Sequence, residues 1–363
     1  MMMLYPPKAA LALALAAVIA TAGAGYAQGT VPLADIVTDW LNSPHAKQQS
    51  ESFRHWDEDG AIPQDCAACH SSPGLVDFLG ADGSPGGAVD QPAMTGSLVD
   101  CVACHNQMAS TLDSVTFPSG EVVVELGNSA ICMVCHQGRQ SGDAVAAAVA
   151  GREDDVIAAD LGFLNVHYRA AAASLLGSVV RGGYQYDGKS YADRFSHVPD
   201  FATCTTCHSP HTLEVTAADC AACHKTDDLR SIRTSPADAD GDGDKTEGVS
   251  GEIATLHDAL GKAIMIYAEE IAGTPLVYAP AAYPYFFADT NRDGLADAEE
   301  TVYPNRYQSW TPRLLKAAYN YQFVAKDPGA YAHNPRYAQQ LMIDSLEDLS
   351  TKVSLGLSRM VRP

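Results

Sequence analysis

Apolar residues recur at helical spacing in the last third of the chain. One apolar face runs through residues 252–272 and ends at Gly273; its members are Ile253, Leu256, Leu260, Ile264, Tyr267 and Ile271. This period predicts an amphipathic helix. A Thr-Pro pair at residues 311 and 312 predicts a second helix to about residue 325, and an Asn-Pro pair at residues 334 and 335 predicts a third to about residue 355. Three such helices need an apolar partner, which is either their own bundle or the rest of the chain.

The pattern before residue 235 is different, because long periodic runs give way to loops rich in Gly and Asp, such as residues 80–87. Residues 121–126 favour a hairpin strand, and His167 is placed at the start of an Ala-rich helix. An acidic linker, residues 235–248, separates the two patterns. We therefore expect a mainly α fold with much irregular loop, divided into a domain at residues 28–234 and a C-terminal helical region at residues 235–363.

The first residues are typical of a secretory signal peptide. Lys8 precedes an apolar, Ala-rich run over residues 9–24, and Gly25, Tyr26 and Ala27 form a small-x-small cleavage site. The run is short for a bilayer anchor. We expect residues 1–27 to be removed on export, and a mature protein without a membrane span in the periplasm or outside the cell.

Composition narrows the classes of partner. The chain has 363 residues, of which 47% are hydrophobic, and its formal net charge is −21 at pH 7. Such a chain can bury one or two cores. Nucleic-acid binding requires a basic surface, so we exclude it. A basic protein surface or bound cations suit the charge better.

The cysteines carry the most specific signal. All ten belong to five copies of C-x-x-C-H. The copies are Cys66, Cys69 and His70; Cys101, Cys104 and His105; Cys132, Cys135 and His136; Cys204, Cys207 and His208; and Cys220, Cys223 and His224. In this motif two thiols attach to the two vinyl groups of a c-type haem, and the adjacent imidazole binds the iron.

Two other interpretations of the cysteines are weaker. Exported cysteines often pair as disulfides, and paired C-x-x-C units often bind zinc. Neither explains a histidine directly after every second cysteine. The sequence therefore predicts five covalently bound haems, which supply much of the core of residues 28–234, so that the protein without haem is largely unfolded.

Seven further histidines can supply the second axial ligands. His211 lies three residues after His208, too close to reach the opposite face of the same porphyrin, so it is expected to bind a neighbouring haem. Only 11 residues separate His208 from Cys220, so the last two haems are neighbours. The predicted distal ligands are His45, His167, His197, His211 and His333, with His55 and His257 in reserve.

Two acidic loops favour calcium. The first matches the EF-hand pattern from residue 289 to residue 300, with candidate ligands Asp289, Asn291, Asp293, Leu295 (main chain), Asp297 and Glu300. The second begins in the same way with Asp238, Asp240 and Asp242 but has Val249 where the bidentate Glu belongs. The alternative for the second loop is a solvated acidic linker. We expect one or two structural Ca²⁺ ions.

The repeated motifs resemble those of bacterial multihaem (pentahaem) c-type cytochromes. The resemblance rests on the five C-x-x-C-H copies, on Ser43-Pro-His45-Ala46 before the first copy, and on C-x-x-C-H-x-P-H ending at His211. The segments 310–322 and 326–335 are also similar to exported polyhaem cytochromes. The resemblance implies a multihaem cytochrome c architecture with bis-His haems and a role in respiratory or extracellular electron transfer.

Three functions fit this picture. In the first, all five haems are bis-His and pass electrons between redox proteins, such as donor or acceptor cytochromes or a membrane quinol dehydrogenase, with no catalytic residue in the chain. In the second, one open haem reduces or oxidises a small nitrogen or sulfur compound, as in nitrite reductases. In the third, subunits self-assemble into a conducting haem filament. The supply of histidines favours the first, an electron carrier rather than an enzyme.

Overall fold

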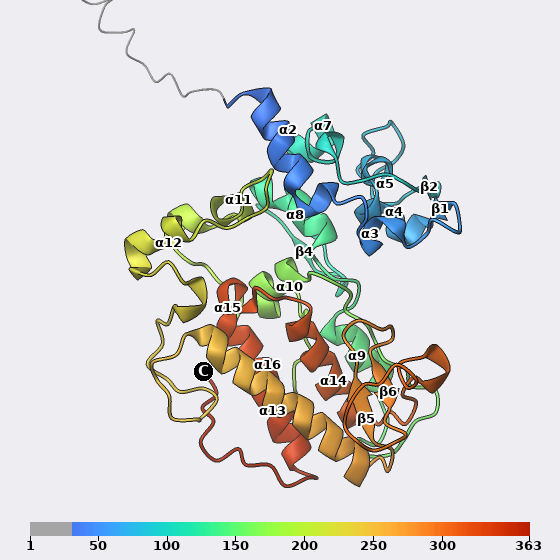
Figure 1. Cartoon of the computed structure of the whole chain (residues 1–363), viewed down its shortest axis with the longest axis vertical. Coiled ribbons are helices and arrows are strands. Elements are labelled where there is room, and N and C mark those ends of the chain that lie inside the picture. The colour runs from blue at the N-terminus through green and yellow to red at the C-terminus, as the bar shows by residue number, and fades with distance from the viewer. Residues whose placement is uncertain (1–30) are drawn as a thin grey trace, which may run out of the picture.

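The structure, a computed structural model, describes residues 31–363. The predicted signal peptide lies outside the described residues. Figure 1 shows short helices of the N-terminal part at one end of the molecule and long C-terminal helices at the other. In residues 31–363, none of the helices combines the length and the apolar character of a membrane span.

Short elements make up the part of the chain that contains the cysteine motifs. Its α-helices are α2 (Leu33–Asn42), α3 (Glu51–Arg54), α4 (Gln64–His70), α5 (Ser72–Phe78), α6 (Cys101–Cys104), α7 (Gln107–Thr111), α8 (Ala130–Cys135), α9 (Gly142–Val149), α10 (Ala171–Leu176), α11 (Cys204–Cys207) and α12 (Ala217–His224). Its 3₁₀ turns are η1 (Pro44–Ala46), η2 (Gly127–Ser129), η3 (Gly177–Val179), η4 (Pro199–Phe201) and η5 (Leu229–Ser231).

Two small antiparallel hairpins lie among these helices. Strand β1 (Ala61–Ile62) pairs with β2 (Ala93–Met94), and β3 (Val115–Thr116) pairs with β4 (Val122–Val123). The strand predicted within residues 121–126 is confirmed as β4. The helix predicted from His167 is wrong at its start, because His167 adopts a positive φ of 76°, which no α-helix accommodates, and α10 begins at Ala171.

The C-terminal region contains the long helices. They are α13 (Val249–Glu270), α14 (Pro312–Ala325) and α16 (Pro335–Ser350), with the short α15 (Ala330–His333), the turn η6 (Tyr303–Asn305) and the hairpin β5 (Leu276–Tyr278) and β6 (Phe286–Ala288). The Thr311 hydroxyl accepts from Leu314 N at 3.2 Å and caps α14, and the Asn334 side chain accepts from Tyr337 N at 3.1 Å and caps α16. The three predicted helices are confirmed, and the third ends earlier than residue 355.

The core of this region lies where α13, α14 and α16 pack together. Leu256, Trp310, Tyr319 and Tyr337 are at most 1% exposed. Burying one large apolar side chain contributes roughly 1.5–3 kcal/mol before entropy is counted. The same cluster of buried residues includes Met133, from the motif region. The domain boundary at residue 235 stays a prediction.

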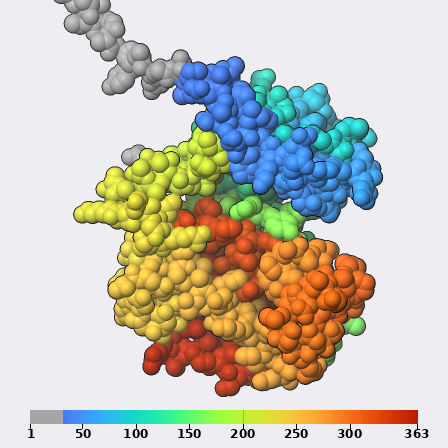
Figure 2. All heavy atoms as spheres, in the orientation of Figure 1, coloured from blue at the N-terminus to red at the C-terminus, as the bar shows by residue number. Residues whose placement is uncertain are grey.

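The helices also hold the segment between the third and fourth motifs. The Asn320 carboxamide accepts from Tyr184 N at 2.7 Å and donates to Tyr184 O at 3.0 Å. Arg313 donates to Asp155 Oδ1 at 2.7 Å. The three helices therefore form a bundle and also contact the rest of the chain. The predicted fold class, mainly α with irregular loops, is confirmed. Figure 2 shows the N-terminal and C-terminal surfaces on either side of this middle segment.

Candidate haem-binding site

Each cysteine motif forms or ends a short helix of four to eight residues. The turns belong to α4, α6, α8, α11 and α12. Residues i and i+3 of a helix share one face, so both thiols of a motif point the same way. All ten cysteines are at least partly exposed and none is paired with another as a disulfide. The motif turns therefore present two accessible thiols and one imidazole to the same side, as haem attachment requires.

The structure brings each motif histidine beside one other histidine. The ring centroids are 5.9 Å apart for His70 and His167, 6.3 Å for His105 and His211, 6.4 Å for His136 and His45, 6.3 Å for His208 and His333, and 5.8 Å for His224 and His197. The second members are the five predicted distal histidines. No two motifs share a partner.

This separation fits a metal between the rings. A metal–nitrogen bond of about 2 Å on each side, plus about 1.1 Å from each nitrogen to its ring centre, gives about 6.2 Å between centroids. The ten histidines therefore fit five irons with two imidazoles each. Direct stacking or hydrogen bonding between two imidazoles would bring the rings closer.

Hydrogen bonds to the ring nitrogens set the tautomer of four of these histidines. Nδ1 of His70 lies 2.8 Å from Ser52 O, that of His136 lies 3.0 Å from Arg169 O, and that of His208 lies 3.0 Å from Leu213 O. A carbonyl only accepts, so Nδ1 carries the hydrogen and Nε2 keeps its lone pair. Iron ligation through Nε2 needs this tautomer.

The fourth of these histidines has a carboxylate partner. Nδ1 of His333 lies 2.9 Å from both oxygens of Asp327, which is 3% exposed. Burial disfavours the charged form of His333, but the Asp327 carboxylate outweighs burial and raises the pKa of His333. No sequence pattern identified Asp327, because only the turn before α15 brings its carboxylate to His333.

Two of the distal candidates are held neutral. Burial, together with the neighbouring His136, lowers the pKa of His45 to about 4. Burial, together with the neighbouring His70, lowers the pKa of His167 to about 4. At neutral pH both imidazoles are unprotonated, which is the form that binds a metal.

The two reserve histidines lie elsewhere. Nε2 of His257 is hydrogen-bonded to Tyr321 O at 3.0 Å, and the His257 ring stacks on the Tyr321 ring with 3.9 Å between centroids. His55 is exposed, and its Nδ1 lies 2.9 Å from Glu51 Oε1. Neither ring stands at the spacing of the five pairs from a motif histidine, so these two residues have local structural contacts instead.

The motif turns also lie close to one another. Cys69 Sγ lies 3.9 Å from Val134 O, and Cys135 Sγ lies 3.8 Å from Ala68 O, which joins the first and third motifs. Cys204 N donates to Ser129 Oγ, directly before α8, at 3.1 Å, and a hydrogen bond from the thiol of Cys132 lowers the pKa of Cys204, so the fourth motif lies beside the third. The third motif is therefore central to the arrangement.

The first acidic loop has the hydrogen bonds of a cation-binding turn. The Asp289 carboxylate accepts from Arg292 N at 2.6 Å and Gly294 N at 3.0 Å. Asn291 accepts from Asp293 N at 2.9 Å, and its amide reaches Asp297 Oδ2 at 2.9 Å. These bonds draw the predicted ligands into one loop.

The residue at the end of that loop turns inward. Glu300 is 4% exposed and its Oε1 accepts from Thr290 N at 2.6 Å. Its Oε2 is buried without a hydrogen-bond partner. An oxygen in this state is suited to binding a cation.

The second acidic loop repeats the same scheme. Asp238 accepts from Gly241 N at 2.8 Å and Gly243 N at 3.1 Å, and Asp240 accepts from Asp242 N at 3.2 Å. Two further acidic residues that the pattern did not identify, Glu247 and Glu252, join it. Burial and the nearby carboxylates, Asp240 first among them, raise the pKa of Glu247 to about 7.

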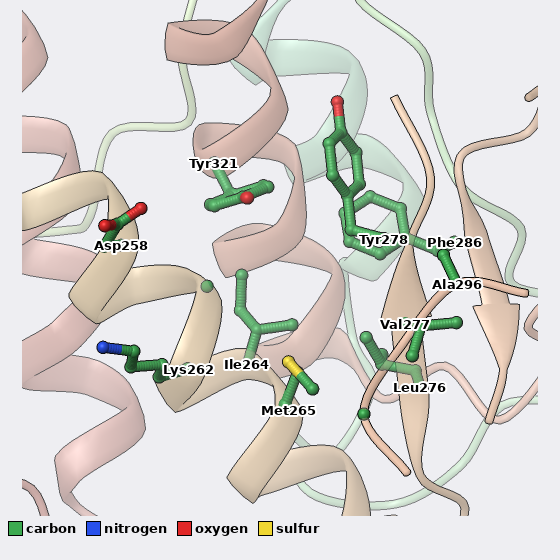
Figure 3. A pocket seen from close by; sticks show the side chains of 12 residues that line it. Asp258, Lys262, Ile264, Met265, Leu276, Val277, Tyr278, Phe286, Ala296 and Tyr321 are labelled. Atoms are coloured by element: carbon green, nitrogen blue, oxygen red, sulfur yellow. The ribbon is translucent and has the colours of Figure 1, made fainter. Parts of the chain in front are cut away.

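A surface pocket lies apart from these groups, between α13, β5 and the first acidic loop (Figure 3). It is lined by residues that include Asp258, Lys262, Met265, Tyr278 and Tyr321, and by none of the paired histidines. Its walls therefore have no part in the arrangement of the motifs.

Comparison with known proteins gives two similar relatives. The chain is 29% identical over 351 residues to the C-type polyheme cytochrome OmcB of Geobacter sulfurreducens, which covers 82% of this chain and 45% of that protein. It is 29% identical over 349 residues to the C-type polyheme cytochrome OmcC of the same organism, which covers 81% of this chain and 43% of that protein. The chain thus spans less than half the length of these relatives.

No protein-family model matches the chain, and no solved structure does. The relatives are polyheme cytochromes by name, and their similarity extends well beyond the short motifs. The chain, with its five C-x-x-C-H motifs and its mainly helical fold, is thus similar to C-type polyheme cytochromes.

Proposed function

We propose that the chain carries electrons through five c-type haems, each attached by one cysteine motif and bound by two histidines. The observation that carries the proposal is the set of five histidine pairs with ring centroids 5.8 to 6.4 Å apart. Haem supplies the one-electron chemistry, because its iron changes oxidation state without a bond being made in a substrate.

The histidine pairs determine whether an iron would have a coordination position free for a substrate. With an imidazole on both sides, an iron has no position for a substrate, so the five pairs favour an electron carrier over an enzyme with one open haem. Backbone carbonyls on Nδ1 of His70, His136 and His208 orient the rings. Such outer partners fix the ring and raise the basicity of the ligand.

The close motifs give the electrons a route. The first and fourth motifs both lie beside the third, while His208 and His211 carry two neighbouring haem sites on one short segment. The last motif follows the fourth directly along the chain, in α12. Under this proposal the third haem is a junction, and electrons reach it from more than one side.

We include export and acidic-to-basic docking of redox partners in this proposal. The leader-like residues 1–27 favour transport out of the cytoplasm, to the periplasm or the cell exterior, where c-type haems are handled in an oxidising compartment. The net charge of −21 favours redox partners with a basic surface, such as a donor or acceptor cytochrome or a membrane quinol dehydrogenase.

One calcium ion in the loop at residues 289–300 also belongs to this proposal. The pattern of Asp289, Asn291, Asp293, Asp297 and Glu300, with the main chain of Leu295, matches the ligand positions of an EF-hand loop. The unpartnered Glu300 oxygen supports the assignment. Its role is structural, since the loop follows the β5–β6 hairpin.

The test is low-temperature electron paramagnetic resonance of the oxidised holoprotein, with haem counted by the pyridine haemochrome method. We expect five low-spin haems per chain and no change on adding nitrite or hydroxylamine. A ligand-sensitive high-spin signal from one haem in the wild-type protein would overturn bis-His ligation throughout and favour the enzyme.

A matched pair of variants sharpens the test. His167→Ala removes the ring beside His70, so about one fifth of the haem should become high-spin and bind nitrite. His55→Ala removes an exposed ring that is not paired with a motif histidine, and all haems should stay low-spin. An unchanged spectrum for His167→Ala would contradict the pairing.

A further inference from the structure

The second acidic loop holds a compact group of carboxylates at the start of α13, which electron transfer does not use. Oxygens of Asp238, Asp240 and Glu252 lie within 4.8 Å of one another, as do oxygens of Asp240, Asp242 and Glu247. Asp240 and Glu252 are 5% and 2% exposed. Like charges at this range repel strongly away from water, so a bound cation would stabilise the arrangement.

An arginine of the chain neutralises one carboxylate of the group. Arg233 Nη1 lies 2.5 Å from Glu252 Oε1, and Ala239 N donates to Glu252 Oε2 at 2.6 Å. Arg233 therefore neutralises the charge of Glu252. Between residues 31 and 363 no comparable ion pair neutralises the other four carboxylates, Asp238, Asp240, Asp242 and Glu247.

Two oxygens of these four carboxylates are buried without a hydrogen-bond partner. Asp240 Oδ1 accepts from Asp242 N, but Asp240 Oδ2 has no hydrogen-bond partner, and neither has Glu247 Oε1. Buried polar atoms almost always have a partner in folded proteins. Asp240 belongs to both carboxylate triplets and therefore links them.

We propose that Asp238, Asp240, Asp242 and Glu247 bind one calcium ion at the junction between the fifth motif and α13. Calcium accepts six to eight oxygen ligands and prefers carboxylates and main-chain carbonyls. Glu247 takes the part of the glutamate that the loop pattern lacks at Val249. The site is separate from the loop at residues 289–300 and does not depend on how the irons are bound.

The ion would hold three segments together. Val361 N donates to Ala239 O at 3.1 Å, and Gly241 packs so closely on Arg359 that an added Cβ would lie 2.5 Å from its carbonyl carbon. Glu247 is the last acidic residue before α13, whose first turn contains Glu252. Binding therefore fixes the loop against the C-terminal segment and the helix.

The experiment is calorimetric titration of Ca²⁺ into chelator-treated holoprotein. Wild type, Asp240→Asn, Glu247→Gln and Asp244→Asn are compared. Asp244 is the matched control: it is exposed in the same loop, Asn keeps its acceptor for Thr246 N, and the change removes the same charge. Absorption and circular dichroism spectra confirm that each variant keeps its haems and its fold.

We expect one binding event to weaken tenfold or more in Asp240→Asn and in Glu247→Gln, and every event to stay within about threefold of wild type in Asp244→Asn. Equal weakening by Asp240→Asn and Asp244→Asn would show a diffuse attraction of an acidic segment and would overturn the site. So would binding that neither Asp240→Asn nor Glu247→Gln changes. The spin state of the haems reports separately on the proposed function.

Discussion

The motif region and the C-terminal region are built in opposite ways. In the motif region, α6 and α11 contain four residues each, and the strands contain two. In the C-terminal region, α13 contains 22 residues and α16 contains 16. A helix of one turn is not stable by itself, because the cost of its first turn is not recovered. The short helices must therefore be held by something other than their own hydrogen bonds.

The difference shows where each region obtains its stability. Large apolar side chains such as Trp310 and Tyr319 fill the space between the long helices. The motif turns instead contain cysteines and histidines, residue types that can attach a haem and bind its iron. We infer that covalently bound haem stabilises the motif region, as buried aromatic side chains stabilise the packing of the long helices.

The largest expected effect is on the folding of the two regions when haem is withheld. The chain should be produced where haem is not attached, and its amide hydrogen exchange compared with that of the holoprotein. Helices α4, α6, α8, α11 and α12 should lose protection almost completely, while α13, α14 and α16 keep most of theirs. Equal loss in both regions would show that the long helices also depend on haem.

A smaller effect tests the helical core by substitution. Leu256→Ala removes a side chain that is 0% exposed in α13, and it should lower the free energy of unfolding by about 2–5 kcal/mol in denaturant titration. Ile266→Ala, in the same helix at 37% exposure, is the control and should cost roughly 1 kcal/mol or less. Low-spin haem should persist in both. Similar losses from the two variants would contradict the assigned core.

The smallest effect concerns one haem potential. Asp327→Asn replaces the carboxylate beside His333 by a neutral amide, so the ligand donates less charge to the fourth haem. Its midpoint potential should rise by on the order of 50 mV in a spectroelectrochemical titration, since a tenfold change in relative affinity corresponds to about 59 mV for one electron. Asp193→Asn changes an exposed acid outside the pair and serves as control. A fall in potential would contradict the role of Asp327.

The sequence predicted the long helices because their signals are local. Apolar spacing marked the body of α13, and the caps at Thr311 and Asn334 marked the starts of α14 and α16. The end of α16 at Ser350 was missed, because the chain beyond it keeps an apolar pattern. His167 was misplaced in a helix, since its positive φ follows from the tertiary position of its ring.

The candidate site likewise contains residues that a local pattern identifies and residues that none does. The C-x-x-C-H motifs are local and were found from the sequence, while the partner of each motif histidine comes from a distant segment, and no spacing rule gives it. The five chosen distal histidines are those that the structure pairs, and their binding of iron stays a prediction. Glu247 was missed because it occupies the tenth position of the twelve-residue loop template, which is not a ligand position.

The histidine pairs also constrain the order in which the protein can mature. The second and third motifs are paired with His211 and His45, and the fourth is paired with His333, far along the chain. During translocation, a haem fixed at Cys204 and Cys207 would meet its second ligand only after α13 and α14 had also emerged. Attachment and final ligation are then separate events in time, and the last of them coincides with closure of the C-terminal helices.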